Sequence, residues 1–514
     1  MSAAKKKSPL RRAGSILYHI VFFLLLFGTF SLIWVQMHFA NISVEEIIFH
    51  LRMPLEGTSS SLVRSFMLTS LLPALILFAV KVATALRPSR YADALMIVGR
   101  KRTLRVDLSN PRVARTLRAA LCLCWALILV LGLNHSYGLV AYIRNLSTPS
   151  TFIAEEYVDP RDVRLTFPEK KRNLITIFVE SGETTIQDVE SGGLLPFNYI
   201  PEMTRIAEEN VSFSQSRRID GAMLSPGAGW TIAALFAETT GLPLKIGINL
   251  ANTMDGYGAF VPGAYSLGEI LEEAGYHNFF LAGSDFTFGG RTNYFTQHGQ
   301  YEIWDYDSAL SENRLPEPDY YAWWGFEDQK LYAFAQEKLT ALAAAGEPFN
   351  FSMLTADTHH IDGYVCELCE DVYDYQYANV WACASRQLDG FLRWIQAQDF
   401  YENTTVVIYG DHPSMQPNFF DEEMSGLRHV YNAIVNSAVE TERETNRLFT
   451  TLDFFPTTLA SLGVTIEGDR LGLGVNLFSG TPTLSELYGY SFLMEELEKR
   501  SVFYEKELLF AQGH

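Results

Sequence analysis

Long apolar stretches near the N-terminus and shorter apolar runs farther along divide the chain into two parts. The long stretches lie at 15–37, 66–86 and 119–139. As a helix, each stretch is long enough to cross about 30 Å of hydrocarbon. The first is too long for a signal peptide, and no small-x-small cleavage site follows it. The sequence therefore predicts three transmembrane helices.

Basic residues predict the orientation of these helices. Lys and Arg precede the first stretch at 5–12 and fill the gap between the second and third at 87–118, whereas the loop between the first two holds only Arg52 and Arg64. By the positive-inside rule, the N-terminus and the basic gap are cytoplasmic, and everything after about residue 140 lies on the other side of the membrane.

The charge balance supports this division. The first 118 residues contain 17 Lys/Arg and 5 Asp/Glu, a net charge of +12, whereas the whole chain carries −19. The remainder is therefore strongly acidic, which disfavours nucleic acid as a partner. We expect a membrane domain at 1–140, a linker with three prolines at 141–170 and a catalytic domain at 171–514.

In the last of these domains, amphipathic stretches alternate with short apolar runs. Predicted helices and the strands that follow them are 267–274 with 278–282, 327–342 with 349–354, and 373–398 with the run that starts at Val406. This alternation is typical of βαβ units. We therefore expect an α/β fold with a doubly wound, mostly parallel sheet and a site at the C-terminal ends of its strands.

Two apolar runs end in ionisable residues. Asn173-Leu-Ile-Thr-Ile-Phe-Val leads directly to Glu180, and Val406-Val-Ile-Tyr-Gly leads to Asp411 and His412. A buried parallel strand has this pattern when its tip delivers ligands to a site. Two carboxylates and an imidazole at one sheet edge point to a divalent metal, the alternatives being a strand cap or a structural ion pair.

Four further residues are candidates for the chemistry around such a metal. Thr231 starts a predicted helix after a glycine-rich loop, where backbone N–H groups favour an anion; its hydroxyl is a candidate nucleophile, or else an ordinary cap. Arg291 follows a glycine pair and suits phosphate contact or a surface ion pair. His359 and His360 follow another apolar run. On an extended segment neighbours point opposite ways, so one would face the site while the other packs.

The loop between the first two apolar stretches contains a short amphipathic segment at 43–51. Ser43 and Glu46 have the spacing of a capping box, and the apolar face comprises Val44, Ile47, Ile48 and Leu51. We expect a helix in the outer membrane–water interface, with a loop packed on the soluble domain as the alternative.

Three of the five cysteines, Cys366, Cys369 and Cys383, lie in the predicted catalytic domain. The Cys-x2-Cys spacing alone is weak support for zinc, because no second pair completes four ligands. In an oxidising compartment we expect Cys383 to form a disulfide with Cys366 or Cys369.

The order of these motifs resembles the membrane-anchored phosphotransferase branch of the alkaline phosphatase/sulfatase superfamily. That branch includes lipoteichoic acid synthases, phosphoethanolamine transferases and the phosphoglycerol transferase I enzymes that modify periplasmic glucans. The last group is most similar in three motifs: Trp230-Thr231 running into Gly241-Leu-Pro, Asp357-Thr-His-His-x-Asp-Gly, and Arg291-x-Asn-x4-His298-Gly. The similarity spans about 170–480 and ends in a sulfatase-like helix at Thr451-x-Asp-Phe-Phe-Pro.

The resemblance implies a function and a set of roles. Glu180, Thr231, Asp411 and His412 would bind one divalent metal, Mn²⁺ in the first place, with Zn²⁺ or Mg²⁺ as alternatives. Thr231 would become phospho-modified, His359 would act as acid/base, and Arg291, His359 and His360 would contact the substrate. The donor would be phosphatidylglycerol, the acceptor a periplasmic glucan, and the location the bacterial inner membrane with a periplasmic catalytic domain.

Thr240 departs from the glucan-modifying pattern, in which a Cys tends to precede the glycine that matches Gly241. Two alternatives follow. A phosphoethanolamine transferase shares the same core residues. A sulfatase, or another hydrolase, is the weaker alternative, because Ser225-Pro226 lacks the Arg of a Cys/Ser-x-Pro-x-Arg string.

Overall fold

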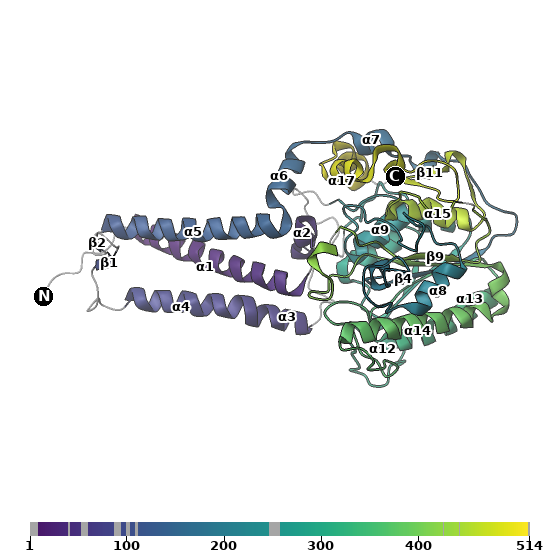
Figure 1. Cartoon of the computed structure of the whole chain (residues 1–514), viewed down its shortest axis with the longest axis horizontal. Coiled ribbons are helices and arrows are strands. Elements are labelled where there is room, and N and C mark those ends of the chain that lie inside the picture. Colours follow the sequence, from purple (N-terminus) through teal and green to yellow (C-terminus); the bar gives the residue numbers. More distant parts are fainter. Residues whose placement is uncertain are drawn as a thin grey trace. The chain divides into compact units, whose positions relative to one another are not determined.

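Two structural units make up the chain (Figure 1). The computed structural model describes residues 9–39, 42–52, 60–86, 94–98, 103–107, 111–245, 258–424, 426–441 and 443–511. The first unit comprises Met1–Phe39 and Ser59–Ala141, and the second comprises Ala40–Thr58 and Tyr142–His514.

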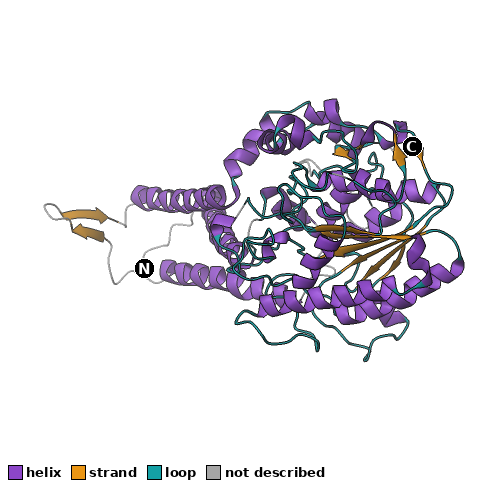
Figure 2. Cartoon of the chain, turned by 45° about the vertical axis from the view of Figure 1, so that its right-hand side comes forward, coloured by secondary structure: helices purple, strands orange, loops and turns teal. Residues whose placement is uncertain are grey.

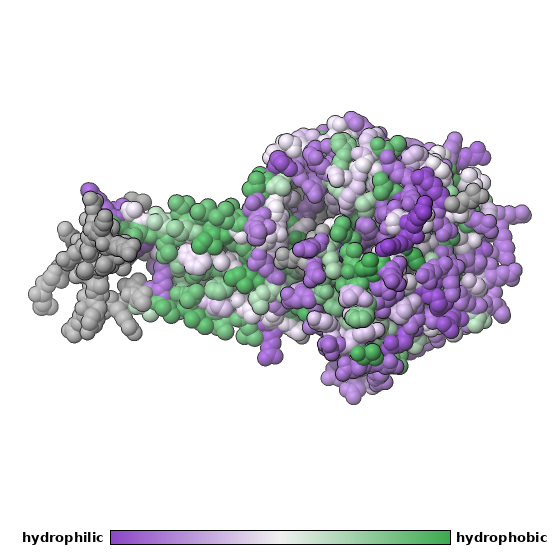
Figure 3. Space-filling view, viewed as in Figure 1, coloured by the Kyte–Doolittle hydropathy of each residue, from purple (hydrophilic) through white to green (hydrophobic). Residues whose placement is uncertain are grey.

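Long helices with apolar surfaces form the first unit (Figure 3). Its elements are α1 (Pro9–His38), α3 (Ser60–Phe66), the π-helical turn η1 (Met67–Leu71), α4 (Leu72–Leu86), α5 (Pro111–Tyr137) and the strands β1 (Ala94–Val98) and β2 (Thr103–Asp107). Within the described residues, Ala13–His38, Ser61–Ala83 and Arg115–Tyr137 are long and apolar enough to span a membrane. They coincide with the three predicted stretches. The N-terminal lysines and much of the basic gap at 87–110 lie outside the described residues.

The second unit contains a mixed set of helices and strands. Its helices are α2 (Val44–Arg52), α6 (Leu139–Ser147, whose first turn belongs to the first unit), α7 (Phe152–Glu156), α8 (Pro201–Glu209), α9 (Thr231–Thr240), α10 (Leu267–Glu273), α11 (Arg291–Gln297), α12 (Tyr306–Ser311), α13 (Asp328–Ala345), α14 (Gln376–Gln396), α15 (Phe454–Ser461), α16 (Leu484–Tyr488) and α17 (Tyr490–Glu498). Its strands are β3 (Leu165–Thr166), β4 (Asn173–Val179), β5 (His277–Ala282), β6 (Glu302–Trp304), β7 (Phe349–Leu354), β8 (Thr404–Gly410), β9 (Asn432–Val435), β10 (Thr465–Ile466), β11 (Arg470–Leu471) and β12 (Gly474–Val475).

A six-stranded sheet in the order β6-β5-β7-β4-β8-β9 forms the centre of this unit. All neighbouring strands are parallel except β8 and β9, which are antiparallel. The predicted mostly parallel α/β sheet is confirmed, and its predicted strands match β4, β5, β7 and β8. In the central pair, Val179 of β4 is in register with Gly410 of β8.

Helices cover both faces of the sheet (Figure 2), so the central strands β4, β7 and β8 are buried along nearly their whole length. One face packs on α8, α13 and α14 through residues such as Ile177, Met203 and Trp381, all fully buried. On the other face Tyr409 of β8 stacks on Phe454 of α15, with ring centroids 3.9 Å apart. Burial on both faces explains why these strands appear in the sequence as continuous apolar runs.

The segment expected to link the two parts, 141–170, is folded. It contains α7, most of α6 and the short strand β3, and it contacts residues near the C-terminal end of the chain. Asn145 donates a hydrogen bond to Glu498 (2.9 Å), and Phe152 packs edge-on against Tyr488, with centroids 5.3 Å apart.

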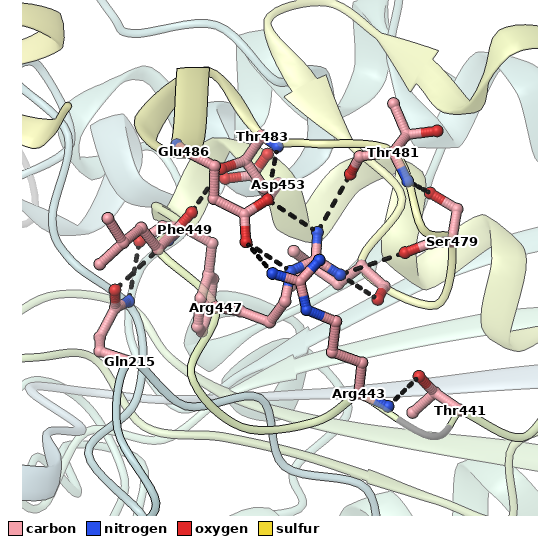
Figure 4. Close-up of polar contacts among 12 residues, drawn as sticks. Gln215, Thr441, Arg443, Arg447, Phe449, Asp453, Ser479, Thr481, Thr483 and Glu486 are labelled. Atoms are coloured by element: carbon pink, nitrogen blue, oxygen red, sulfur yellow. Dashed lines mark hydrogen bonds and ion pairs between the residues drawn. The ribbon is translucent and has the colours of Figure 1, made fainter. Parts of the chain in front are cut away.

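A buried arginine organises the segment that follows the sheet (Figure 4). Arg447 is fully buried, and its Nε lies 2.9 Å from Oε1 of Glu486. Its remaining nitrogens donate to backbone carbonyls of Leu477, Ser479 and Thr481, each at 3.1 Å. One guanidinium thus holds the chain between β12 and α16, because it satisfies carbonyl oxygens that have left the sheet.

We expect Arg447→Met to destabilise the second unit by about 3–5 kcal/mol, because it leaves a largely buried carboxylate and several carbonyls without their donor. Arg443 is the matched control, since it contacts the same Glu486 oxygen at 3.1 Å but its side chain is 53% exposed. Arg443→Met should change stability by less than about 1 kcal/mol. Denaturant unfolding of the purified chain measures both, and equal effects would contradict this account.

Candidate functional site

The two central strands of the sheet deliver two carboxylates to the same edge. Glu180 follows β4 and Asp411 follows β8. The two residues are buried, with exposed fractions of 3% and 0%, respectively. Because β4 and β8 are parallel neighbours in register, residues that follow their ends must lie close together. The strand pattern in the sequence therefore located this pair correctly.

Two glycines allow the strand ends to approach each other. A Cβ on Gly410 would lie 1.7 Å from the carbonyl oxygen of Gly182, and a Cβ on Gly182 would lie 2.7 Å from the Cα of Gly410. Neither position accepts a side chain. Between Glu180 and Gly182, Ser181 adopts a left-handed conformation with φ 58°. Its N–H donates to Oδ1 of Asp411 at 2.8 Å, which ties the two strand ends together.

His412 turns its Nε2 atom toward the carboxylates. Nδ1 lies 3.0 Å from the carbonyl oxygen of Pro413, so that it is the protonated nitrogen and Nε2 carries the lone pair. Nε2 lies 3.5 Å from Oδ2 of Asp411 and 3.8 Å from Oε1 of Glu180. Ligand atoms of these three residues all lie within 4.8 Å of one another.

The donor set fits a divalent cation. Burial raises the pKa of Asp411 well above its ordinary value, and the neighbouring Glu180 raises it further. Among the residues that the structure describes, none donates a hydrogen bond to Oδ2 of Asp411, although this atom is buried. Buried carboxylate oxygens without donors are ordinarily compensated by a cation, and two carboxylates with one imidazole suit Mn²⁺ or Zn²⁺.

Thr231 brings a hydroxyl to this cluster. It is the first residue of α9, and its Oγ1 donates to Oε2 of Glu180 at 3.3 Å. Two further threonines of α9 use their hydroxyls inside the helix: Thr239 donates to the carbonyl of Leu235 (2.5 Å) and Thr240 to that of Phe236 (2.6 Å). Ser181 also brings a hydroxyl to the cluster, because its Oγ donates to Oε1 of Glu180 at 3.0 Å. Thr231 differs from it in lying at the N-terminus of a helix.

His359 and His360 do not point in opposite directions, so that expectation is wrong. They lie in a turn after β7 rather than on an extended segment, and their rings stack with centroids 4.4 Å apart. Nδ1 of His359 lies 2.5 Å from the carbonyl oxygen of His360, which leaves its Nε2 as the basic atom. Burial lowers the pKa of His359, and Glu180 opposes that shift while His412 and Arg291 add to it. Trp324 packs on its ring, at 4.7 Å.

Arg291 begins α11 and is 5% exposed. Burial lowers the pKa of its guanidinium to about 10, and the charges of Asp285, Glu180 and Asp411 act in the opposite direction. Its Nε and Nη2 donate to the preceding loop, at 3.0 Å to the carbonyl of Phe288 and 2.7 Å to that of Asp285. The surface ion pair considered for Arg291 is excluded, because its side chain is buried.

Sequence reasoning missed the groups that hold the site in place. The hydroxyl of Thr355 accepts from the N–H of Glu180 (3.0 Å), and Thr358 donates to the carbonyl of Glu180 (2.5 Å). The carboxylate of Asp357, which follows β7, does not join the cluster. It accepts from the N–H of Asp328 at the start of α13 (3.2 Å). The sequence signal that could have identified the two threonines is their position in the segment that follows β7.

The amphipathic segment between the first two apolar stretches forms a helix of the second unit. In α2 the hydroxyl of Ser43 accepts from the N–H of Glu46 (3.0 Å), as a capping box requires. The side of α2 that packs on the protein was not predicted: Glu46 and Phe49 are buried, whereas Leu51 is 81% exposed. Phe49 packs on Trp230, the residue before Thr231, with centroids 5.4 Å apart.

Known proteins are similar to this chain in sequence. A family model described as Sulfatase matches residues 172–464, more than half of the chain. Phosphoglycerol transferase I of Salmonella choleraesuis (strain SC-B67) is 29% identical over 330 residues, which cover 63% of this chain and 41% of that protein. The corresponding protein of Salmonella arizonae is 31% identical over 256 residues, which cover 49% and 32%. The chain thus spans about two fifths or less of the length of these curated relatives.

Two solved structures have a similar fold at low identity. A protein of the alkaline phosphatase superfamily from Vibrio parahaemolyticus is 19% identical, with a TM-score of 0.48, and the match covers 62% of this chain and 72% of that one. The lipoteichoic acid synthase LtaP from Listeria monocytogenes is 17% identical, with a TM-score of 0.47 and coverage of 64% and 82%.

We expect Asp411→Asn to weaken Mn²⁺ binding by more than roughly 100-fold, because a charged ligand is lost. Loss of an outer-shell partner, a milder change, already lowers metal affinity by roughly 10- to 100-fold. The exposed Asp399 provides the control, and Asp399→Asn should leave the affinity unchanged. Calorimetric titration of chelator-treated protein with Mn²⁺ makes the comparison. Equal affinity for wild type and Asp411→Asn would place the cation elsewhere.

Proposed function

Because the chain belongs to the sulfatase family, we propose that its sheet-edge site transfers phosphoglycerol from phosphatidylglycerol to an extracytoplasmic glycan and releases diacylglycerol. The observation that carries the proposal is the hydroxyl of Thr231, at a helix N-terminus and 3.3 Å from a carboxylate of the cluster. The relatives named phosphoglycerol transferase I support this choice of reaction.

Glu180, Asp411 and His412, together with Thr231, would hold one divalent cation. We propose Mn²⁺, with Zn²⁺ or Mg²⁺ as alternatives. When bound, such a cation neutralises charge on a phosphodiester and makes a nearby hydroxyl easier to ionise. The residues themselves fix the geometry, because Ser181 and Pro413 orient Asp411 and His412 before any ligand arrives.

The proposed reaction consists of two displacements at phosphorus. In the first, Oγ1 of Thr231 forms a bond to phosphorus, the bond to the diacylglycerol oxygen breaks, and the threonine proton ends on that oxygen. In the second, an acceptor hydroxyl forms the new bond, the bond to Thr231 breaks, and the acceptor proton returns to Thr231. The start of α9 favours the reaction, because its unpaired N–H groups and dipole stabilise an anion.

His359 is the proposed carrier of these protons. Its Nε2 is the basic nitrogen, and burial lowers its pKa, so the ring is neutral and able to accept a proton near pH 7. His360 stacks beneath it and fixes its plane. Arg291 would contact the phosphate, and the effect of Glu180 and Asp411 on the pKa of its guanidinium supports this role.

A lipid donor agrees with the helices of the first unit. Ala13–His38, Ser61–Ala83 and Arg115–Tyr137 are apolar enough to anchor the chain in a membrane. We propose that the chain is a multi-pass protein of the bacterial inner membrane, with the second unit in the periplasm and a glucan as acceptor. The distribution of Lys and Arg along the sequence supports this orientation.

Thr231→Ala should abolish diacylglycerol release from phosphatidylglycerol, and not merely slow transfer to the glycan, because the nucleophile of the first step is lost. Labelled phosphatidylglycerol in mixed micelles, with and without glucan, measures both steps. Thr240→Ala is the control, since its hydroxyl is bonded within α9, and it should keep most of the activity.

Normal diacylglycerol release by Thr231→Ala would assign the nucleophile to another residue. Release by the wild-type protein from phosphatidylethanolamine alone would replace phosphoglycerol with phosphoethanolamine as the transferred group. Inorganic sulfate release from a sulfate ester, with neither lipid consumed, would make the chain a hydrolase.

Phe49→Ala should lower turnover of phosphatidylglycerol by at least about tenfold, while the Mn²⁺ affinity falls far less than in Asp411→Asn. The reason is that Phe49 supports Trp230, and a small displacement of the neighbouring nucleophile is costly. Leu51→Ala, on the same helix but exposed, is the matched control. A loss of Mn²⁺ binding in Phe49→Ala as large as that in Asp411→Asn would instead indicate that α2 supports Glu180, Asp411 and His412, which contradicts the proposed role.

A further inference from the structure

The sulfurs of three cysteines lie close together, in segments that follow the turn with His359 and His360. Cys366 and Cys369 lie in the loop before α14, and Cys383 lies on α14 itself. The sulfur of Cys366 is 3.6 Å from that of Cys369 and 3.7 Å from that of Cys383. All three residues are free thiols, so the expected disulfide is wrong for this structure. A disulfide requires about 2.05 Å between sulfurs and would engage only two of the three.

These distances are those of a thiolate metal site. Zn²⁺ binds cysteine sulfur at about 2.3 Å in a tetrahedron, which separates neighbouring sulfurs by about 3.8 Å. The two sulfur–sulfur distances from Cys366 agree with that value to within about 0.2 Å, and the three sulfurs all lie within 4.8 Å of one another. The sulfur of Cys366 is thus about equally far from those of Cys369 and Cys383, as expected if all three bind the same cation.

The surrounding groups donate hydrogen bonds to the sulfurs. The backbone N–H groups of Leu368 and Cys369 point to the sulfur of Cys366. The turn is closed by a bond from the N–H of Cys369 to the carbonyl of Cys366, at 3.1 Å. Nε2 of Gln387 lies 3.4 Å from the sulfur of Cys383 and 3.6 Å from that of Cys366. Donors to sulfur stabilise thiolates, and such outer-shell contacts accompany metal sites.

We propose that Cys366, Cys369 and Cys383 bind one Zn²⁺ ion, at a site separate from the carboxylate cluster of Glu180. Cys366 and Cys383 are buried, whereas Cys369 is partly exposed, so a fourth ligand from solvent completes the tetrahedron on that side. The Cys-x2-Cys pair thus finds its third ligand on α14, although the sequence offers no second pair.

The site would fasten the loop to the helix that supports the histidine turn. Tyr377, one and a half turns before Cys383 on α14, donates from its hydroxyl to the carbonyl of Thr358 at 2.8 Å. Tyr364, two residues before Cys366, donates from its N–H to the carbonyl of Asp357 at 2.7 Å. The two residues before His359 are therefore held by segments that the Zn²⁺ would join, which assigns the cation a structural role.

Metal analysis of the full chain tests the proposal without any measurement of activity. Protein purified in detergent without chelator should contain a zinc ion that is lost in Cys369→Ser and kept in Asp411→Asn. Cys124→Ser is the control, because this cysteine is exposed on α5 of the other unit. Zinc content that is the same in Cys369→Ser and in wild type would overturn the proposal.

A second measurement does not depend on the folding of a cysteine variant. Asp411→Asn protein, stripped of metal under reducing conditions and titrated with Co²⁺, should develop a thiolate-to-cobalt charge-transfer band in the near ultraviolet at one equivalent. No such band would contradict the proposal. A disulfide between Cys383 and Cys366 or Cys369, found by mass spectrometry in unreduced protein as purified, would overturn it as well.

Discussion

Two buried carboxylates of like charge stand side by side at the edge of the sheet, and the rest of the site is arranged around them. Glu180 and Asp411 follow adjacent parallel strands, so the register of β4 and β8 leaves them no room to separate. Two unit charges about 4 Å apart repel each other by roughly 4 kcal/mol at an effective dielectric constant of about 20. Burial raises the pKa of Asp411 well above its ordinary value, and the repulsion from Glu180 raises it further. A cation bound between these groups removes the conflict, which is why the arrangement has the character of a binding site.

The backbone of the strand ends is adapted to the same constraint. Gly182 and Gly410 permit an approach that any Cβ would block, and Ser181 takes a left-handed conformation from which its N–H reaches Asp411. A strained backbone conformation of this kind persists only where surrounding contacts compensate for its cost. Thr355 and Thr358 provide such contacts from the strand on the other side of β4. Three neighbouring strand ends therefore act together to position one carboxylate.

The sequence predicted the sheet and the grouping of Glu180, Asp411 and His412 at its edge, because both follow from local pattern. Strands buried on both faces are continuous apolar runs, and an ionisable residue directly after such a run stands out. The directions of His359 and His360 were not predictable in this way, because they depend on a turn rather than on strand alternation. The buried face of α2 was missed because Phe49 packs on Trp230, some 180 residues away. The role of Arg447 was missed for the same reason, since its partners follow the sheet at 477–486.

Detection of the covalent intermediate tests the central claim most directly. Wild-type protein mixed with phosphatidylglycerol in the absence of an acceptor, quenched rapidly and digested, should yield the peptide that contains Thr231 with the added mass of one glycerophosphate group. Fragmentation of that peptide should locate the group on Thr231 and not on Thr239 or Thr240. Release of diacylglycerol without modification of Thr231, or with the group on another residue, would contradict the account.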